Sequence, residues 1–282
     1  MKLADHRGGP SQESQSMEGI KHIVAVASGK GGVGKSTVTA NLALALAGEG
    51  LKVGLLDADI YGPSQAQMFG VPTGQRPEMA GEQVFSPIIA HGIKTMSMAY
   101  LVDVKDPMVW RGPMVAGAFQ QLLNQTAWGE LDILLIDMPP GTGDIQLTLS
   151  QKVPVSGAVI VTTPQDIALL DAQKGIEMFR KVKVPVLGVV ENMSTHTCTQ
   201  CGHTEAVFGA GGGERIAGEY ETRLLGQLPL TLSIRANADG GRPSVIAEPE
   251  GEVAESFRVI ARQVAAALDG ADAEQGPSIS FS

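Results

Sequence analysis

A glycine-rich segment near the start of the chain has the residue types and spacing of a phosphate-binding loop. Residues 29–36 read Gly-Lys-Gly-Gly-Val-Gly-Lys-Ser and fit the pattern G-x-x-x-x-G-K-[ST]. An apolar run over residues 23–27 precedes the segment and a helix-forming run over 37–47 follows it, which is the context that the pattern requires. Backbone N–H groups of such a loop surround phosphate oxygens, and the positive end of the helix dipole points at the same anions. The segment therefore predicts that the chain binds ATP with Mg²⁺.

The polar residues of this loop have separate predicted roles. Lys35 supplies a fixed cation for the β- and γ-phosphates, and the Ser36 hydroxyl is the expected Mg²⁺ ligand. Lys30 adds a second positive charge directly after the first glycine. It is either a solvated lysine or a group that reaches the nucleotide of a partner subunit, in the manner of an arginine finger. The predicted nucleotide contacts in the loop are Gly29, Lys30, Gly31, Gly32, Val33, Gly34, Lys35, Ser36 and Thr37.

Carboxylates follow two other predicted strands. The run over residues 52–56 is followed by Asp57 and Asp59, and the run over 133–136 is followed by Asp137. Ligands of open α/β sheets bind at the carboxyl ends of strands, so these side chains are expected to face the loop. We expect Asp137 and Asp57 to contact Mg²⁺ through its bound waters, and Asp59 to orient the attacking water. Either Asp57 or Asp59 could instead cap a turn or a helix.

The loop that follows Asp137 is the candidate sensor of the γ-phosphate. Residues 139–143 read Pro-Pro-Gly-Thr-Gly, which is too rich in turn formers to be helical. Such a loop can move when the γ-phosphate is lost.

The chain has two cysteines, Cys198 and Cys201, in a C-x-x-C pair. Two thiolates at this spacing can share one metal, but zinc and iron–sulfur sites usually need four ligands. A two-fold dimer could bring two pairs together, or His196 and His203 could complete a local site. The pair could also be a dithiol redox motif or two structural cysteines. We favour the dimeric metal site, and the spacing does not choose its metal.

Strands alternate with helices along the chain. Expected strands cover residues 23–27, 52–56, 133–136, 157–162, 186–190 and 224–228, and expected helices cover 37–47, 167–180 and 252–268. This order predicts an α/β fold with a mostly parallel central sheet and helices on both faces. We expect one domain over 20–269, with a disordered leader (1–19) and a disordered tail (270–282). Residues 62–110, with many prolines and glycines, are expected to form loops and a short hairpin.

Charge and hydropathy exclude several classes of protein. The net charge of −9 over 282 residues disfavours nonspecific binding to nucleic acid or anionic lipid. The first twenty residues lack the apolar region of a signal peptide. No apolar run is long enough to cross a bilayer. We therefore expect a cytoplasmic protein without nucleic-acid or membrane partners.

The extra lysine of the loop resembles the deviant Walker A class of P-loop NTPases, which includes MinD, ParA and the nitrogenase iron protein. Within that class, five further segments resemble the Mrp/ApbC family of iron–sulfur cluster carrier ATPases. They are DADIYGPS at 57–64, VWRGP at 109–113, DMPPGTGD at 137–144, TTPQ at 162–165 and ENMS at 191–194, the last leading to the cysteine pair. The resemblance covers roughly residues 20–268.

The resemblance implies a homodimer that binds and slowly hydrolyses one ATP per subunit. A labile [4Fe–4S] cluster would be bridged by the two cysteine pairs and passed to apo-proteins. By position, Lys30 would contact phosphate across the interface, Asp59 would serve the hydrolytic water and Asn192 would recognise adenine. One alternative is a partitioning ATPase of the MinD/ParA type, and another is a nucleotide-dependent binding module in which zinc links the two subunits. The tail is neither amphipathic nor basic, which disfavours the partitioning role.

Overall fold

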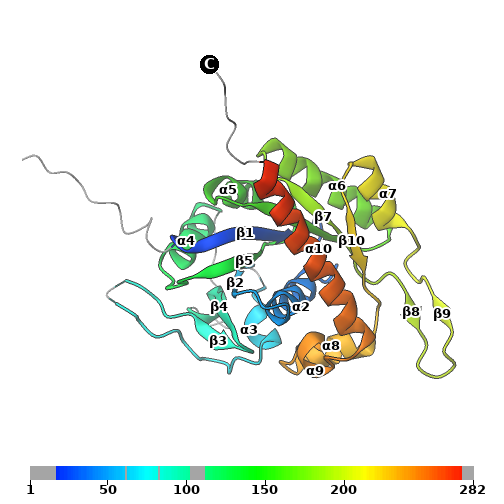
Figure 1. Cartoon of the computed structure of the whole chain (residues 1–282), viewed down its shortest axis with the longest axis horizontal. Coiled ribbons are helices and arrows are strands. Elements are labelled where there is room, and N and C mark those ends of the chain that lie inside the picture. Colours follow the sequence, from blue (N-terminus) through cyan, green and yellow to red (C-terminus); the bar gives the residue numbers. More distant parts are fainter. Residues whose placement is uncertain (1–16, 61, 82, 102–111, 275–282) are drawn as a thin grey trace, which may run out of the picture.

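The chain folds around an eight-stranded sheet in which every neighbouring pair is parallel except the last (Figure 1). The computed structural model describes residues 17–60, 62–81, 83–101 and 112–274. The strand order is β10 (Leu224–Gln227), β7 (Val186–Glu191), β6 (Gly157–Thr162), β1 (Ile20–Ala27), β5 (Leu131–Asp137), β2 (Val53–Asp57), β4 (Ile93–Ser97) and β3 (Ile88–Ala90). A separate two-stranded hairpin joins β8 (His196–Thr197) to β9 (Thr204–Glu205).

Helices cover both faces of the sheet (Figure 1). One face is covered mainly by α2 (Lys35–Gly48) and α10 (Glu252–Glu274), and the other by α4 (Gly112–Asn124), α5 (Asp144–Lys152), α6 (Asp166–Lys181) and α7 (Gly212–Glu219). Shorter helices are α3 (Gln65–Met68), α8 (Leu232–Asp239), α9 (Ser244–Ala247) and a 3₁₀ turn at Met98–Tyr100.

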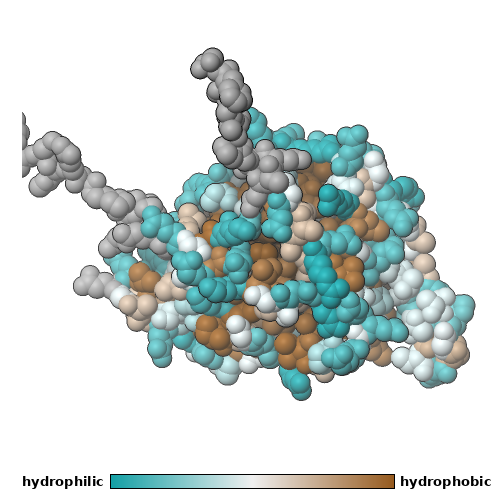
Figure 2. Space-filling view, in the orientation of Figure 1, coloured by the Kyte–Doolittle hydropathy of each residue, from teal (hydrophilic) through white to brown (hydrophobic). Residues whose placement is uncertain are grey.

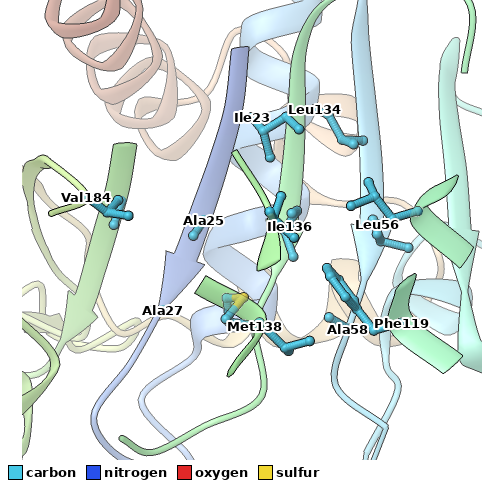
Figure 3. Close-up of a cluster of buried hydrophobic side chains, with 14 of the residues drawn as sticks. Ile23, Ala25, Ala27, Leu56, Ala58, Phe119, Leu134, Ile136, Met138 and Val184 are labelled. Atoms are coloured by element: carbon cyan, nitrogen blue, oxygen red, sulfur yellow. The ribbon is translucent and has the colours of Figure 1, made fainter. Parts of the chain in front are cut away.

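Each buried strand contributes to two hydrophobic cores, because successive side chains point to opposite faces of the sheet. In β5, Leu134 and Ile136 lie in the same core as Leu56 and Phe119, as Figure 3 shows. The alternate residues of β5 lie in the core beneath α2 and α10. Burial on both faces explains why these strands are continuous apolar runs in the sequence.

The predicted fold class is confirmed, and most element boundaries lie within three residues of the prediction. The first strand begins at Ile20 rather than at residue 23. The last helix extends to Glu274, so the tail predicted to begin at 270 starts inside this helix. Ala271 and Ala273 have high helix propensity and continue the helical sequence beyond the expected end at residue 268. The predicted leader up to residue 16 and the tail from 275 lie outside the described residues.

Residues 62–110 are more regular than expected. The predicted hairpin is present as β3–β4, but β4 also pairs in parallel with β2 and so extends the central sheet. A single helical turn, α3, follows β2. Residues 102–111, which include most of the VWRGP segment, lie outside the described part of the chain. Among the helices of the described residues, none combines the length and apolar character needed to cross a bilayer.

Candidate functional site

The glycine-rich loop lies between β1 and α2, where the carboxyl ends of the central strands meet. Asp57 and Val26, at the ends of β2 and β1, both align with Asp137 at the end of β5. A cavity of about 230 Å³ opens here. It is lined by the loop together with Ser36, Asp59 and Pro140. The structure therefore brings the predicted loop and carboxylates to one place. A larger hollow of about 400 Å³ lies at the opposite, amino ends of the strands, between Lys52 and Glu130.

Two glycines of the loop permit close approach of other segments. A Cβ atom at Gly29 would lie 1.9 Å from the carbonyl oxygen of Asp171 in α6. Gly34 has a φ of 83°, and a Cβ there would lie 2.2 Å from Nδ2 of Asn192. Any larger residue at either position would push a neighbouring segment away. Lys30, by contrast, has an exposed side chain, and its predicted contact with a partner subunit stays a prediction.

The buried cation of the site is Lys35, whose side chain is 5% exposed. Its Nζ lies 2.5 Å from Oδ1 of Asp137, 3.2 Å from Oγ of Ser36 and 3.8 Å from Oδ2 of Asp59. Since Lys35 begins α2, the helix N-terminus adds its partial positive charge at the same point. The loop N–H groups, the N-terminus of α2 and Lys35 can together bind an anion, whereas the carboxylates beside Lys35 favour a cation.

Asp57 is completely buried, and its carboxylate accepts hydrogen bonds from two backbone N–H groups and one hydroxyl. Its Oδ1 accepts from the Asp59 backbone N–H at 3.1 Å, and its Oδ2 accepts from the Gln65 backbone N–H and the Ser97 hydroxyl at 3.1 Å each. Burial raises the pKa of Asp57 to about 7, and the nearby charge of Asp137 adds to the rise. These bonds give Asp57 a role in ordering the segment after β2. The predicted contact with metal-bound waters stays a prediction.

Asp137 is held on both carboxylate oxygens. Besides Lys35, its Oδ1 accepts from the Thr39 hydroxyl at 3.2 Å, and its Oδ2 accepts from Nε2 of Gln65 at 2.8 Å. The same Gln65 nitrogen donates to the Ser36 carbonyl at 3.0 Å. The sequence prediction missed both donors. Thr39 could have been found, since it lies four residues after Lys35 on the same face of α2. Gln65 is 72 positions from Asp137 and has no sequence signal.

The donor set at the cavity fits Mg²⁺. Ser36 and Asp59 place oxygen atoms at the cavity, and further carboxylates lie close behind them. Mg²⁺ prefers oxygen ligands and keeps several of its waters, which this mixture of a hydroxyl and nearby carboxylates would accommodate. The predicted site for a metal–nucleotide complex therefore has suitable chemistry.

The predicted sensor loop, residues 139–143, lies against the glycine-rich loop. The Gly141 N–H donates to the Ser28 carbonyl at 2.9 Å, and a Cβ at Gly31 would contact the Pro140 ring at 3.9 Å. Nε2 of Gln146, a buried residue of α5 that the sequence prediction missed, donates to the Pro140 carbonyl at 2.5 Å. The predicted sensor loop is therefore hydrogen-bonded both to the residue before the glycine-rich loop and to α5.

Asn192, the predicted adenine contact, lies beside the glycine-rich loop at the end of β7. Its Nδ2 donates to the Val33 carbonyl at 2.9 Å, and the side chain is buried. One amide donor therefore holds the loop, and the contact with adenine stays a prediction. The next residue, Met193, has a left-handed φ of 57° and leads toward the cysteines.

The cysteine pair lies between β8 and β9, on a hairpin that projects from the rest of the molecule (Figures 1 and 2). Cys198 is half-buried and Cys201 is exposed. The backbone N–H groups of Cys201 and Gln200 donate to the Cys198 sulfur and lower the pKa of this thiol, and the Cys201 N–H makes the larger contribution. Backbone donors aimed at a sulfur favour the thiolate, which is the form that binds a metal.

The hairpin alone does not form a complete metal site. The described residues contain no group of three or more His, Cys, Asp and Glu side chains placed to hold a metal ion. The local site that His196 and His203 could have completed is thus not formed. Instead, Nδ1 of His196 lies 3.1 Å from the Leu230 carbonyl oxygen. Among the described residues, no third His, Cys, Asp or Glu is therefore placed to share a metal with the two cysteines.

Comparison with protein families gives one model that matches residues 19–265, the ParA family described as NUBPL iron-transfer P-loop NTPase. An iron–sulfur cluster carrier protein of Pseudomonas fragi is 63% identical over 259 residues, covering 92% of this chain and 90% of the relative. The iron–sulfur cluster transfer protein NUBPL of Mus musculus is 51% identical over 260 residues, covering 92% of this chain and 80% of the relative.

Solved structures agree with the fold. A nucleotide-binding protein from Archaeoglobus fulgidus, solved in complex with ADP, matches with a TM-score of 0.75 and 39% identity, covering 87% of this chain and 96% of that one. The cell division ATPase MinD of Pyrococcus furiosus matches with a TM-score of 0.68 and 24% identity, covering 88% and 99%. At that identity, the likeness to MinD concerns the fold alone.

Proposed function

Since the chain belongs to the ParA family of NUBPL iron-transfer P-loop NTPases, we propose that it is an iron–sulfur cluster carrier that binds and hydrolyses Mg·ATP. The observation that carries this proposal is the projecting pair of Cys198 and Cys201, because it offers a thiolate site on the same domain as the phosphate-binding loop. ATP and water would be converted to ADP and phosphate, and the cluster is the cargo.

The nucleotide chemistry follows from the polar groups around the cavity. Loop N–H groups and Lys35 hold the phosphates, and Ser36 is the Mg²⁺ ligand. The metal neutralises charge on the phosphates when it is bound. Asp59 lines the cavity and lies 3.8 Å from Nζ of Lys35, which supports a role in orienting the attacking water. The exposed Lys30 would contact the nucleotide of a second subunit and stabilise charge there.

The cargo site would form between two copies of the chain. Each copy offers two cysteines, and a [4Fe–4S] cluster takes four thiolates. A homodimer with the two hairpins facing each other supplies that number. Receivers would be apo iron–sulfur proteins in the cytoplasm. An exposed hairpin supports this, because a receiving protein could reach the cluster without unfolding the carrier.

Anaerobic reconstitution with iron and sulfide tests the cargo. We expect the wild-type protein to gain the broad visible absorbance of iron–thiolate sites and to activate an apo [4Fe–4S] enzyme. Cys198→Ala and Cys201→Ala should lose both properties while they still bind ATP. Thr199→Ala, at an exposed position between the cysteines, is the matched control and should behave as wild type. Normal delivery by either cysteine variant would contradict the proposal. A colourless protein that contains zinc would instead show that the cysteines bind a structural zinc that links the two subunits.

Hydrolysis is tested by mixing two inactive variants. Asp59→Asn removes the residue that orients water in its own subunit, and Lys30→Ala removes the cation given to the partner. Each variant alone should bind ATP and hydrolyse it poorly. A mixed dimer contains one site with both groups, so mixing should restore part of the phosphate release. If mixing restores nothing, Lys30 does not act across an interface.

A further inference from the structure

A glutamine with no role in the nucleotide chemistry above lies beneath the cavity. Gln65, the first residue of α3, is 1% exposed. Its Nε2 donates to the Ser36 carbonyl at 3.0 Å and to Oδ2 of Asp137 at 2.8 Å. Its Oε1 is also buried and has no hydrogen-bond partner among the residues that the structure describes. One side chain thus connects the residue that binds Mg²⁺ to the carboxylate behind it.

The two carboxylate oxygens of Asp137 have different partners, and this difference indicates a role for Gln65. Its Oδ1 faces Nζ of Lys35 at 2.5 Å, whereas its Oδ2 faces Gln65. In nucleotide binding, Lys35 must turn part of its charge toward the phosphates. The amide of Gln65 carries no charge and has no such second task. It can therefore hold Oδ2 in place while the hydrogen bonding at Oδ1 changes.

The same residue also fixes the segment that follows β2. Its backbone N–H donates to Oδ2 of Asp57 at 3.1 Å, and Ser64 and Met68, on either side in the chain, line the cavity. A shift of this segment would move Gln65 and, with it, the orientation of Asp137. The sequence from 57 to 65 is thereby joined to the glycine-rich loop by side-chain and backbone hydrogen bonds.

We propose that Gln65 is a positioning residue for Mg²⁺: its Nε2 fixes Asp137 and Ser36 in the orientation that binds the metal–nucleotide complex. The inference rests on the proposed nucleotide binding. Groups that orient metal ligands or their waters typically change metal affinity by about 10- to 100-fold when removed. Removing the Gln65 amide should therefore weaken nucleotide binding in the presence of Mg²⁺ and leave binding without Mg²⁺ unchanged.

The test is a titration of each protein with a fluorescent ADP, once with Mg²⁺ and once with EDTA. Gln65→Met keeps the length of the side chain and removes both amide contacts. We define the Mg²⁺ ratio as the dissociation constant in EDTA divided by the dissociation constant in Mg²⁺. In Gln65→Met we expect this ratio to fall by about 10-fold or more. Gln67→Met is the matched control, since Gln67 lies on the same helical turn but is exposed. Its ratio should equal that of the wild type.

Thermal unfolding of the same proteins separates positioning from mere packing. A packing role would lower the melting temperature and leave the Mg²⁺ ratio within about twofold of the wild type, and that result would overturn the inference. Gln65→Asn is a second variant, which keeps an amide but shortens it, and its ratio should also fall. A wild-type protein whose ADP affinity does not depend on Mg²⁺ would overturn the proposed function and this inference with it.

Discussion

Gly34 offers a direct measurement of how the glycine-rich loop and β7 depend on each other. Its φ is 83°, and a Cβ atom there would lie 2.2 Å from Nδ2 of Asn192. Gly32 has the same φ of 83° but nothing within 4 Å of its Cβ position. Alanine at either glycine therefore meets the same backbone strain, and only Gly34→Ala also meets a side chain.

The expected magnitudes follow from these two contributions. A left-handed conformation costs a residue with a Cβ about 1–2 kcal/mol relative to glycine, so Gly32→Ala should destabilise the protein by that amount. Gly34→Ala must also displace Asn192, which is buried and donates to the Val33 carbonyl at 2.9 Å. Leaving these groups without their hydrogen bond costs about 1–3 kcal/mol more.

Urea unfolding followed by circular dichroism, without nucleotide, measures both variants. The double variant Gly34→Ala/Asn192→Ala provides the control, because Asn192→Ala removes the atom that the new Cβ would strike. Relative to Asn192→Ala, the added cost of Gly34→Ala should then equal the cost of Gly32→Ala. If Gly34→Ala alone is no more destabilising than Gly32→Ala, the contact between Asn192 and the loop does not exist as described.

Two further predictions concern protonation. The pKa of Asp57 rises from 3.8 in the unfolded chain to about 7 in the folded protein, so the folded state binds this proton more tightly. The stabilisation is complete below pH 3.8 and is lost as pH rises through 7, about 4 kcal/mol in all. Urea titrations from pH 4 to 8 without Mg²⁺ should show a flatter profile for Asp57→Asn, and an unchanged profile would contradict the burial argument. The pKa of Cys198 is lowered by backbone N–H groups. The rate of its alkylation, followed by mass spectrometry, should therefore have a pH midpoint below that of the urea-unfolded chain. Equal midpoints would show that those hydrogen bonds do not form.

The fold and the phosphate site could be predicted because their signals are local. Buried parallel strands are continuous apolar runs, and the loop pattern lies within eight consecutive residues, 29–36. The aspartates could be placed because they end such runs, and parallel strands bring their carboxyl ends to one edge of the sheet. For these features, the order of residues along the chain already specifies their neighbours in space.

The residues that hold the site together could not be predicted in this way. Gln65 lies in a stretch of weak periodicity, and its contacts with Ser36 and Asp137 span 29 and 72 positions. Gln146 donates to the Pro140 carbonyl six positions earlier, and no sequence motif indicates this contact between α5 and the predicted sensor loop. The pairing of β4 with β2 depends on how the hairpin folds back. The contacts of Gln65 and the pairing of β4 with β2 exist only after the sheet has formed.

The projecting cysteine hairpin has a consequence for how such a carrier would respond to its own abundance. One copy contributes two sulfurs and no further ligand group within the described residues. If the cargo is held between two copies, the loaded form follows the square of the protein concentration under dilute conditions. Loading would then be favoured where the protein is plentiful. Dilution alone would promote unloading, which is a route to delivery that requires no turnover of ATP.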